Sequence, residues 1–96
     1  MITISIGAKA GAFAENKDTA KEIRVGEILP ALKRGEDVVL DFAGVDAATQ
    51  SFVHALISDV FRRYGAEALD RVAFKSCNET VRKIIGIVAD YMQEGD

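Results

Sequence analysis

The chain has 96 residues, of which 49% are hydrophobic and 28% are charged, and its formal net charge is −3. This length suits a single domain over residues 1–96, and the apolar fraction excludes general disorder. The acidic balance argues against nucleic acid or an anionic membrane as partners, and no apolar run is long enough to cross a membrane. The start of the chain has no signal-peptide pattern and Cys77 is the only cysteine, so we expect a cytoplasmic protein without disulfides.

The first elements are a strand and a turn. Residues 1–6 alternate isoleucine with threonine or serine, which predicts a strand with one buried face. Residues 7–11 are small and flexible and are interpreted as a turn. Residues 12–14 are expected to return as a short second strand.

The first helix is predicted to begin near Thr19, because Thr19 and Glu22 have the spacing of a capping box. Apolar residues then recur at helical spacing. Pro30 removes a backbone donor and should kink or divide this helix. Gly35 follows two basic residues, as is usual at a helix C-terminus.

Residues 38–42 give the strongest strand pattern. Both faces carry apolar groups, which predicts a central strand covered on both sides or nearly so. Gly44 and Asp46 mark the exit loop. A second helix is predicted from Thr49 to Tyr64, with a wide apolar stripe and a polar side that includes His54, Ser58, Arg62 and Arg63.

The last strand and helix complete the pattern. Residues 72–74 predict a short core strand, and Ser76 with Glu79 has the spacing of another capping box. The third helix then has a regular apolar seam of Val81, Ile84, Ile85, Val88, Ala89 and Met92. The predicted fold class is α/β, in βαβαβα order, with a mostly parallel sheet of three or four strands and three main helices.

Ligands of open α/β sheets bind at the carboxyl ends of the strands. Here that edge contains Asp41, the loop of residues 43–48 and the start of the second helix. Asp41 interrupts an apolar strand, and it is either a site carboxylate or an acceptor for backbone donors of the following loop. Structural carboxylates of this kind are common, so the second interpretation is favoured.

Thr49, Gln50 and Ser51 place two hydroxyls and an amide at a helix N-terminus. Backbone N–H groups and the helix dipole favour an anion there, such as a free phosphate or one attached to a hydroxyl. Thr49 on its own is better explained as an N-cap. His54 lies about one turn further along, and a solvated helix histidine is favoured over a catalytic base.

Other reactive or charged residues have ordinary explanations. A helix N-terminus could lower the pKa of Cys77, although a half-buried, inert thiol is the favoured interpretation. The remaining basic residues alternate with acids and are expected on a solvated or partner-facing surface: Arg62, Arg63, Arg71, Lys75, Arg82 and Lys83.

Several motifs are missing from the sequence. It has no phosphate-binding glycine loop, no metal-ligand spacing and no arrangement of a nucleophile with a base, so neither a cofactor nor an enzyme is expected. An aspartate acceptor of the receiver type needs acidic residues after the first strand, and residues 1–8 contain none.

The segment VVLDFAGV at residues 38–45, followed by TQSF at residues 49–52, resembles the STAS-like domains, small bacterial relatives of the anti-sigma factor antagonists. The resemblance extends over nearly the whole chain and implies a parallel α/β domain with a protein partner. In antagonists proper, the helix after this strand opens with an Asp-Ser-Ser-Gly-like motif, and a kinase of the GHKL ATPase type phosphorylates one serine. Ser51 falls at the phosphoacceptor place, while Gln50, Thr49 and Phe52 replace the preceding serine, the aspartate and the glycine.

The resemblance therefore implies a non-enzymatic regulatory module with a signalling or transcriptional output, whose partner is a GHKL-type ATPase or kinase. Ser51 and then Thr49 are the phosphoacceptor candidates. The expected partner-binding or anion-binding residues are Asp41, Gly44, Asp46, Gln50 and His54. The alternative is a small-ligand or anion sensor that uses the same helix N-terminus, and formation of a homodimer is left open.

Overall fold

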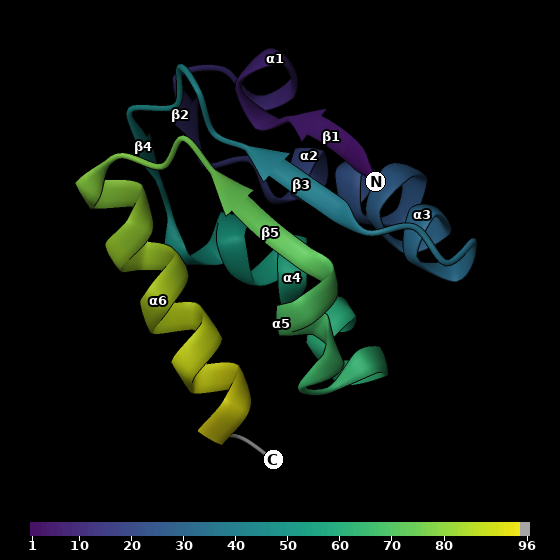
Figure 1. Ribbon diagram of the computed structural model, residues 1–96. Coiled ribbons are helices and arrows are strands. Elements are labelled where there is room, and N and C mark those ends of the chain that lie inside the picture. The colour runs from purple at the N-terminus through teal and green to yellow at the C-terminus, as the bar shows by residue number, and fades with distance from the viewer. Residues whose placement is uncertain (95–96) are drawn as a thin grey trace.

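Three parallel strands form the main sheet, in the order β1 (Ile2–Ser5), β3 (Val38–Asp41) and β5 (Val72–Lys75) (Figure 1). The computed structural model of the chain describes residues 1–94. Ile4 lies opposite Leu40, and Leu40 lies opposite Phe74. The α/β class, the parallel sheet and all three predicted core strands are confirmed.

The helices of both crossovers lie on one face of this sheet. The first crossover contains α2 (Lys17–Ile23), a π-helical segment η1 (Arg24–Ile28) and α3 (Leu29–Lys33), and the second contains α4 (Gln50–Tyr64) and α5 (Glu67–Arg71). Figure 1 shows these helices behind the strands. Because the strand order advances in one direction, right-handed crossovers all fall on the same face.

The predicted cover on both faces of the central strand is therefore wrong. Val38 and Leu40 point into the helix layer and are buried. Their neighbour Val39 lies in a row with Thr3 and Ala73 on the other face, where both flanking residues are exposed. No helix crosses this face in Figure 1.

Two very short strands form a second, parallel pair near the start of α4. They are β2 (Phe13–Ala14), which the sequence predicted, and β4 (Ala47–Ala48), which was expected to be loop. Hydrogen bonds continue the pairing at both ends, from Asp46 N to Ala12 O at 2.7 Å and from Thr49 N to Ala14 O at 3.0 Å. Two residues are too few for a periodic pattern, so β4 leaves no signal in the sequence.

The predicted turn at residues 7–11 is instead a helix, α1 (Ile6–Ala10), and the hydroxyl of Ser5 accepts a hydrogen bond from Ala8 N at 3.2 Å. Gly7 lies so close to the loop after β3 that an added Cβ would be 2.6 Å from the Ala43 carbonyl oxygen. A glycine therefore allows α1 to pack against that loop.

Both predicted capping boxes are wrong. The cap of α2 is Asn16, whose side-chain oxygen accepts hydrogen bonds from Asp18 N at 2.8 Å and Thr19 N at 3.3 Å. The side-chain oxygen of Asn78 likewise accepts from Val81 N at 2.8 Å at the start of α6 (Glu79–Glu94). In both places an asparagine supplies the acceptor, three residues before the predicted cap Thr19 and two residues after the predicted cap Ser76.

The predicted division of the first helix is confirmed. The π-helical segment η1 separates α2 from α3, and Pro30 is the second residue of α3. Proline provides no N–H for a hydrogen bond to the preceding turn, which favours such an interruption. The last turn ends at Lys33, and Gly35 has a φ of +87°.

The second helix confirms its predicted bounds, with Thr49 as the N-cap and Gly65 as the C-cap. Its apolar stripe contains Phe52, Val53, Leu56, Ile57 and Val60, which are all buried. Ser58, predicted on the polar side, is also buried, and both α2 and α6 pack against α4. No helix among residues 1–94 is long and apolar enough to span a membrane.

Candidate functional site

Asp41 ends the central strand and has a local structural role. Its carboxylate accepts a hydrogen bond from Ala43 N at 2.9 Å. The loop is also fixed by the hydrogen bond from Phe42 N to Lys75 O at 2.8 Å. The interpretation of Asp41 as an acceptor for loop donors is confirmed.

The loop after Asp41 is held by its backbone. Gly44 has a φ of +82°, and Val45 N donates to Phe42 O at 3.0 Å, which closes a tight turn. The Asn78 amide donates to the carbonyl oxygen of Asp46 at 2.8 Å, while the Asp46 side chain is exposed. This loop, which includes Gly44 and Asp46, connects the sheet to β2 and α6 through hydrogen bonds of its backbone groups.

Thr49 fixes the first turn of α4. Its hydroxyl accepts a hydrogen bond from Phe52 N at 3.1 Å, as the N-cap interpretation requires. Because β4 ends directly before Thr49, the helix starts from a paired strand. The position of the next two residues, Gln50 and Ser51, is thereby fixed.

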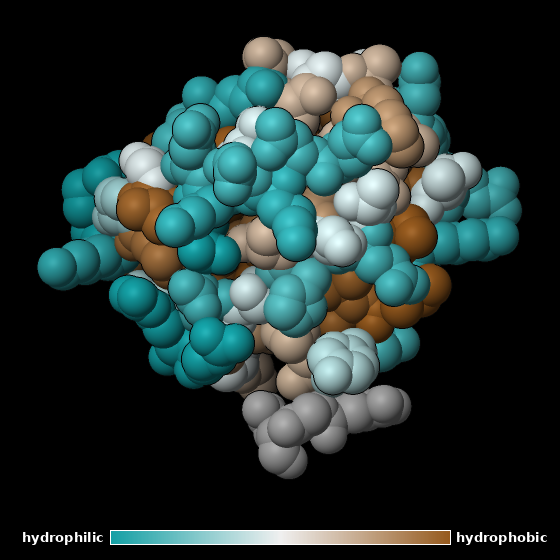
Figure 2. All heavy atoms as spheres, turned by 180° about the vertical axis from the view of Figure 1, so that it is seen from behind, coloured by the Kyte–Doolittle hydropathy of each residue, from teal (hydrophilic) through white to brown (hydrophobic). Residues whose placement is uncertain are grey.

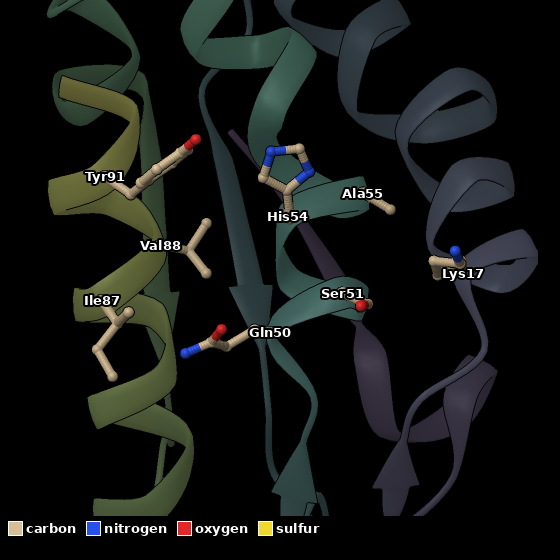
Figure 3. Close-up of a pocket in the computed structure, with 8 residues that line it drawn as sticks. All are labelled: Lys17, Gln50, Ser51, His54, Ala55, Ile87, Val88 and Tyr91. Carbon is tan, nitrogen blue, oxygen red and sulfur yellow. The ribbon is translucent and has the colours of Figure 1, made fainter. Parts of the chain in front are cut away.

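A groove of about 410 Å³ lies over the first turns of α4, between the start of α2 and the C-terminal half of α6; we call it the α4–α6 groove. Figure 3 shows Tyr91 directed toward His54 across it, while Ser51 lies on the side of α4 that faces Lys17. Its lining residues are Lys17, Gln50, Ser51, His54, Ala55, Ile87, Val88 and Tyr91.

The wall that α6 provides is apolar and accessible. Ile87 is 50% exposed and Tyr91 is 65% exposed, whereas Val88 between them is buried. Figure 2 shows apolar side chains gathered over this helix, with hydrophilic side chains around them. Exposed apolar side chains that lie together and are surrounded by polar ones are a feature of surfaces that bind a partner.

The wall that α4 provides is polar. Gln50, Ser51 and His54 are all exposed, and Ser51 lies in the first turn, where unpaired backbone N–H groups and the helix dipole favour negative charge. These three residues, which the sequence analysis named as site candidates, therefore line the groove. Asp41, Gly44 and Asp46 are not among the residues that line the groove.

Five lining residues were missed by the sequence reasoning: Lys17, Ala55, Ile87, Val88 and Tyr91. Ile87 and Tyr91 are four residues apart and lie beside the predicted apolar seam of α6, so an apolar pair outside the seam was the available signal. Lys17 belongs to a helix whose start was predicted two residues too late.

Cys77 is half-buried, and burial raises the pKa of its thiol above the usual value. The nearby Arg82 lowers this pKa and the nearby Asp41 raises it, both by less than burial does. The inert thiol was therefore the better interpretation. Among the described residues, no group of three or more His, Cys, Asp or Glu side chains is placed to hold a metal ion.

Arg71 was predicted on a solvated or partner-facing surface, and it instead connects two elements of the fold. Its side chain is 17% exposed and donates hydrogen bonds to Leu32 O at 2.9 Å and to Glu36 O at 3.3 Å. Its guanidinium carbon also lies 5.4 Å from the centre of the Tyr64 ring. The planar donor group joins the end of α3 to the strand that follows Arg71.

The strand order and the helices on one face define a small parallel α/β domain, and an accessible groove lies at the start of its central helix. The sequence profile of the family described as STAS-like domain of unknown function (DUF4325) matches residues 20–82, which is more than half of the chain. The chain belongs to this family, and the resemblance stated from the sequence is confirmed. No curated protein and no solved structure matches the chain.

The matched range begins within α2 and ends within α6. It includes β3, the loop after it and the polar wall of the α4–α6 groove. Lys17 and the apolar wall of Ile87, Val88 and Tyr91 lie outside it.

Proposed function

We propose that this chain is a non-enzymatic regulatory module that binds a protein partner through the α4–α6 groove. The accessible apolar wall beside a polar wall that carries a free hydroxyl is the observation that supports this proposal. By resemblance, the partner is an ATPase or kinase of the GHKL type, and the output is signalling or transcriptional.

We further propose that phosphorylation of Ser51 controls the binding. Ser51 is exposed in the first turn of α4, whereas the hydroxyl of Thr49 already serves as the cap. In the transfer, the Ser51 Oγ would attack the γ-phosphorus of ATP, ADP would leave, and the hydroxyl proton would pass to a base of the kinase or to water. Thr49 is the poorer acceptor because its modification would remove the cap.

A phosphate on Ser51 would add roughly −1.5 to −2 charges at neutral pH. The helix N-terminus would stabilise this charge, and Lys17 is the cation among the lining residues. The same charge would oppose burial of the neighbouring apolar wall under a partner. Phosphorylation is therefore expected to weaken binding without unfolding the domain.

The phosphorylation step is tested with a purified GHKL-type kinase, taken from the genes beside this chain's gene where they encode one. The wild type, Ser51→Ala and Thr80→Ala are incubated with this kinase and ATP, and phosphate is located by mass spectrometry. Thr80 is an exposed hydroxyl in the first turn of α6 and is the matched control. Phosphate on Ser51 in the wild type and the control supports the proposal, whereas phosphate elsewhere or none contradicts it.

The binding surface is tested separately with the same kinase by calorimetry. Ser51→Glu and Thr80→Glu add the same charge at the second residue of two different helices, so only the first should weaken binding. Ile87→Ser should weaken it by about tenfold. Because Ile87 is half exposed, this variant should remain folded. Unchanged affinity in both Ser51→Glu and Ile87→Ser would remove the groove as the binding surface.

The alternative is an anion or small-ligand sensor, which the convergence of Lys17, Gln50 and His54 on one groove favours. A thermal-shift series with inorganic phosphate and nucleotides separates the two functions. A ligand that binds the folded state at 100 times its Kd stabilises the domain by about 2.7 kcal/mol. Stabilisation that Lys17→Gln abolishes supports the sensor, and no stabilisation leaves the partner module as the function.

A further inference from the structure

A second groove, of about 560 Å³, lies between α3 and the C-terminal part of α4; we call it the α3–α4 groove. It is separate from the α4–α6 groove, and the two share no lining residue. Its lining residues are Val25, Leu29, Pro30, Lys33, Asp59, Arg63 and Tyr64.

The charge of this groove is positive. Both carboxylate oxygens of its acid, Asp59, have partners, because Arg24 Nε lies 3.5 Å from one and Arg62 Nη1 lies 2.8 Å from the other. Lys33 and Arg63 are exposed and form no ion pair with any residue that the structure describes. Two unpaired cations at one groove contrast with the net charge of −3 of the whole chain.

Apolar side chains line the rest of the groove. Val25 is 54% exposed, and Leu29, Pro30 and Tyr64 are half-buried. Val25 belongs to the π-helical segment η1, which Arg24 holds in place by donating to Ala55 O at 2.6 Å. Single-turn π segments are rare and occur frequently at functional sites, where they change the direction of side chains.

We propose that the α3–α4 groove binds an acidic segment of a partner protein, in which carboxylates flank apolar side chains. The carboxylates would pair with Lys33 and Arg63, and the apolar side chains would cover Val25 and Leu29. A basic segment would leave these cations facing like charges, and a neutral segment would remove water from them without compensation. The proposal goes beyond the proposed function and does not depend on Ser51.

The test uses the full chain labelled with 15N and two short synthetic peptides with the same leucine and phenylalanine positions, one with glutamate and one with lysine at the charged positions. The glutamate peptide should shift the amide signals of residues 24–33 and 59–64 in a saturable way. The lysine peptide should not. Arg63→Glu should weaken binding of the glutamate peptide by about tenfold.

Lys17→Glu is the matched control, because it makes the same charge reversal in the α4–α6 groove and should change the affinity by less than about twofold. Val25→Ser tests the apolar wall at an exposed position and should also weaken binding. The dispersion of the amide spectrum confirms that each variant is folded.

Three results of the peptide titrations would overturn the proposal: an equal response to the two peptides, no saturable shift at these amides, or shifts confined to residues 50–55 and 87–91. Shifts of residues 24–33 on raising the protein concentration alone would assign the groove to a second copy of the chain, and would also overturn it. Because Ser51 phosphorylation is measured separately, either proposal can fail while the other holds.

Discussion

The two faces of the central strand β3 have opposite surroundings. Leu40 is fully buried under the helix layer, whereas Val39, the residue before it, points to the face without helices. Both are branched apolar residues in the same strand, so composition alone does not distinguish them. The strand order places both crossovers on the same face of the sheet, and this decides which of the two residues enters the core.

The strand order of the sheet also explains where the grooves lie. Open α/β sheets bind ligands at their carboxyl edge where the strand order reverses, and the order β1–β3–β5 contains no reversal. The carboxyl edge here is held by backbone hydrogen bonds of the loop that contains Gly44 and Asp46. Both grooves lie on the helix layer, one over the first turns of α4 and the other beside its C-terminal part.

The largest expected effect is on the free energy of unfolding, and it compares the two faces of β3 directly. Leu40→Ala removes a side chain with 0% exposure and should destabilise the domain by about 2–5 kcal/mol. Val39→Ala, on the open face, should cost less than about 1 kcal/mol. Urea unfolding followed by circular dichroism measures both. Similar losses for the two variants would mean that the second face is covered as well.

The sequence predicted the covered face well and the open face poorly. Apolar periodicity identified the three core strands and the buried stripe of α4, because burial imposes that periodicity. Within β3 this periodicity gave no sign that one face is open, since Val39 has the same chemistry as its buried neighbours. Only the order of the strands decides this.

The candidate site was predicted only in part, because some of its residues follow from a local pattern and others from long-range packing. Gln50, Ser51 and His54 follow directly from the start of α4, which the sequence located. Ile87 and Tyr91 are brought to them by the packing of α6 against α4, a long-range contact without a local signal. The caps at Asn16 and Asn78 were missed because threonine and serine nearby matched the capping-box spacing.

The next largest effect concerns Arg71, which ties the helix layer to the sheet. Arg71→Met removes the donor of two hydrogen bonds, to Leu32 O and Glu36 O, and should destabilise the domain by about 1–3 kcal/mol. Arg62→Met is the matched control, because Arg62 is exposed and pairs only with Asp59; it should cost less than about 1 kcal/mol. Equal losses in urea unfolding would show that Arg71 is only a surface charge.

A smaller loss of stability is expected for Asp41, which lies on the open face of β3. Asp41→Ala removes the acceptor for Ala43 N and should cost about 0.5–1.5 kcal/mol. Lys75 lies opposite Asp41 in the neighbouring strand, so Lys75→Ala is the control, with an expected change below about 0.5 kcal/mol. Hydrogen exchange of the Ala43 amide should quicken in Asp41→Ala alone. An unchanged exchange rate would show that the turn does not need the carboxylate.

The smallest effect is electrostatic and also involves Asp41. Burial raises the pKa of the Cys77 thiol, so at mildly alkaline pH the folded chain should react with iodoacetamide more slowly than the unfolded chain. The nearby Asp41 raises this pKa and the nearby Arg82 lowers it, so Asp41→Asn should speed the reaction and Arg82→Gln should slow it. Lys83→Gln, the next residue along the exposed side of α6, is the control.

The same pKa shift makes the free energy of unfolding depend on pH. Since the folded state holds the thiol proton more tightly, this contribution to stability is complete below the usual thiol pKa of about 8.5 and is lost as the pH rises through the raised pKa. Cys77→Ser should remove that alkaline loss, as measured by urea unfolding between neutral and alkaline pH. If the loss persists in Cys77→Ser, or if Asp41→Asn slows alkylation, Asp41 and the half-buried thiol are not coupled across the carboxyl edge of the sheet.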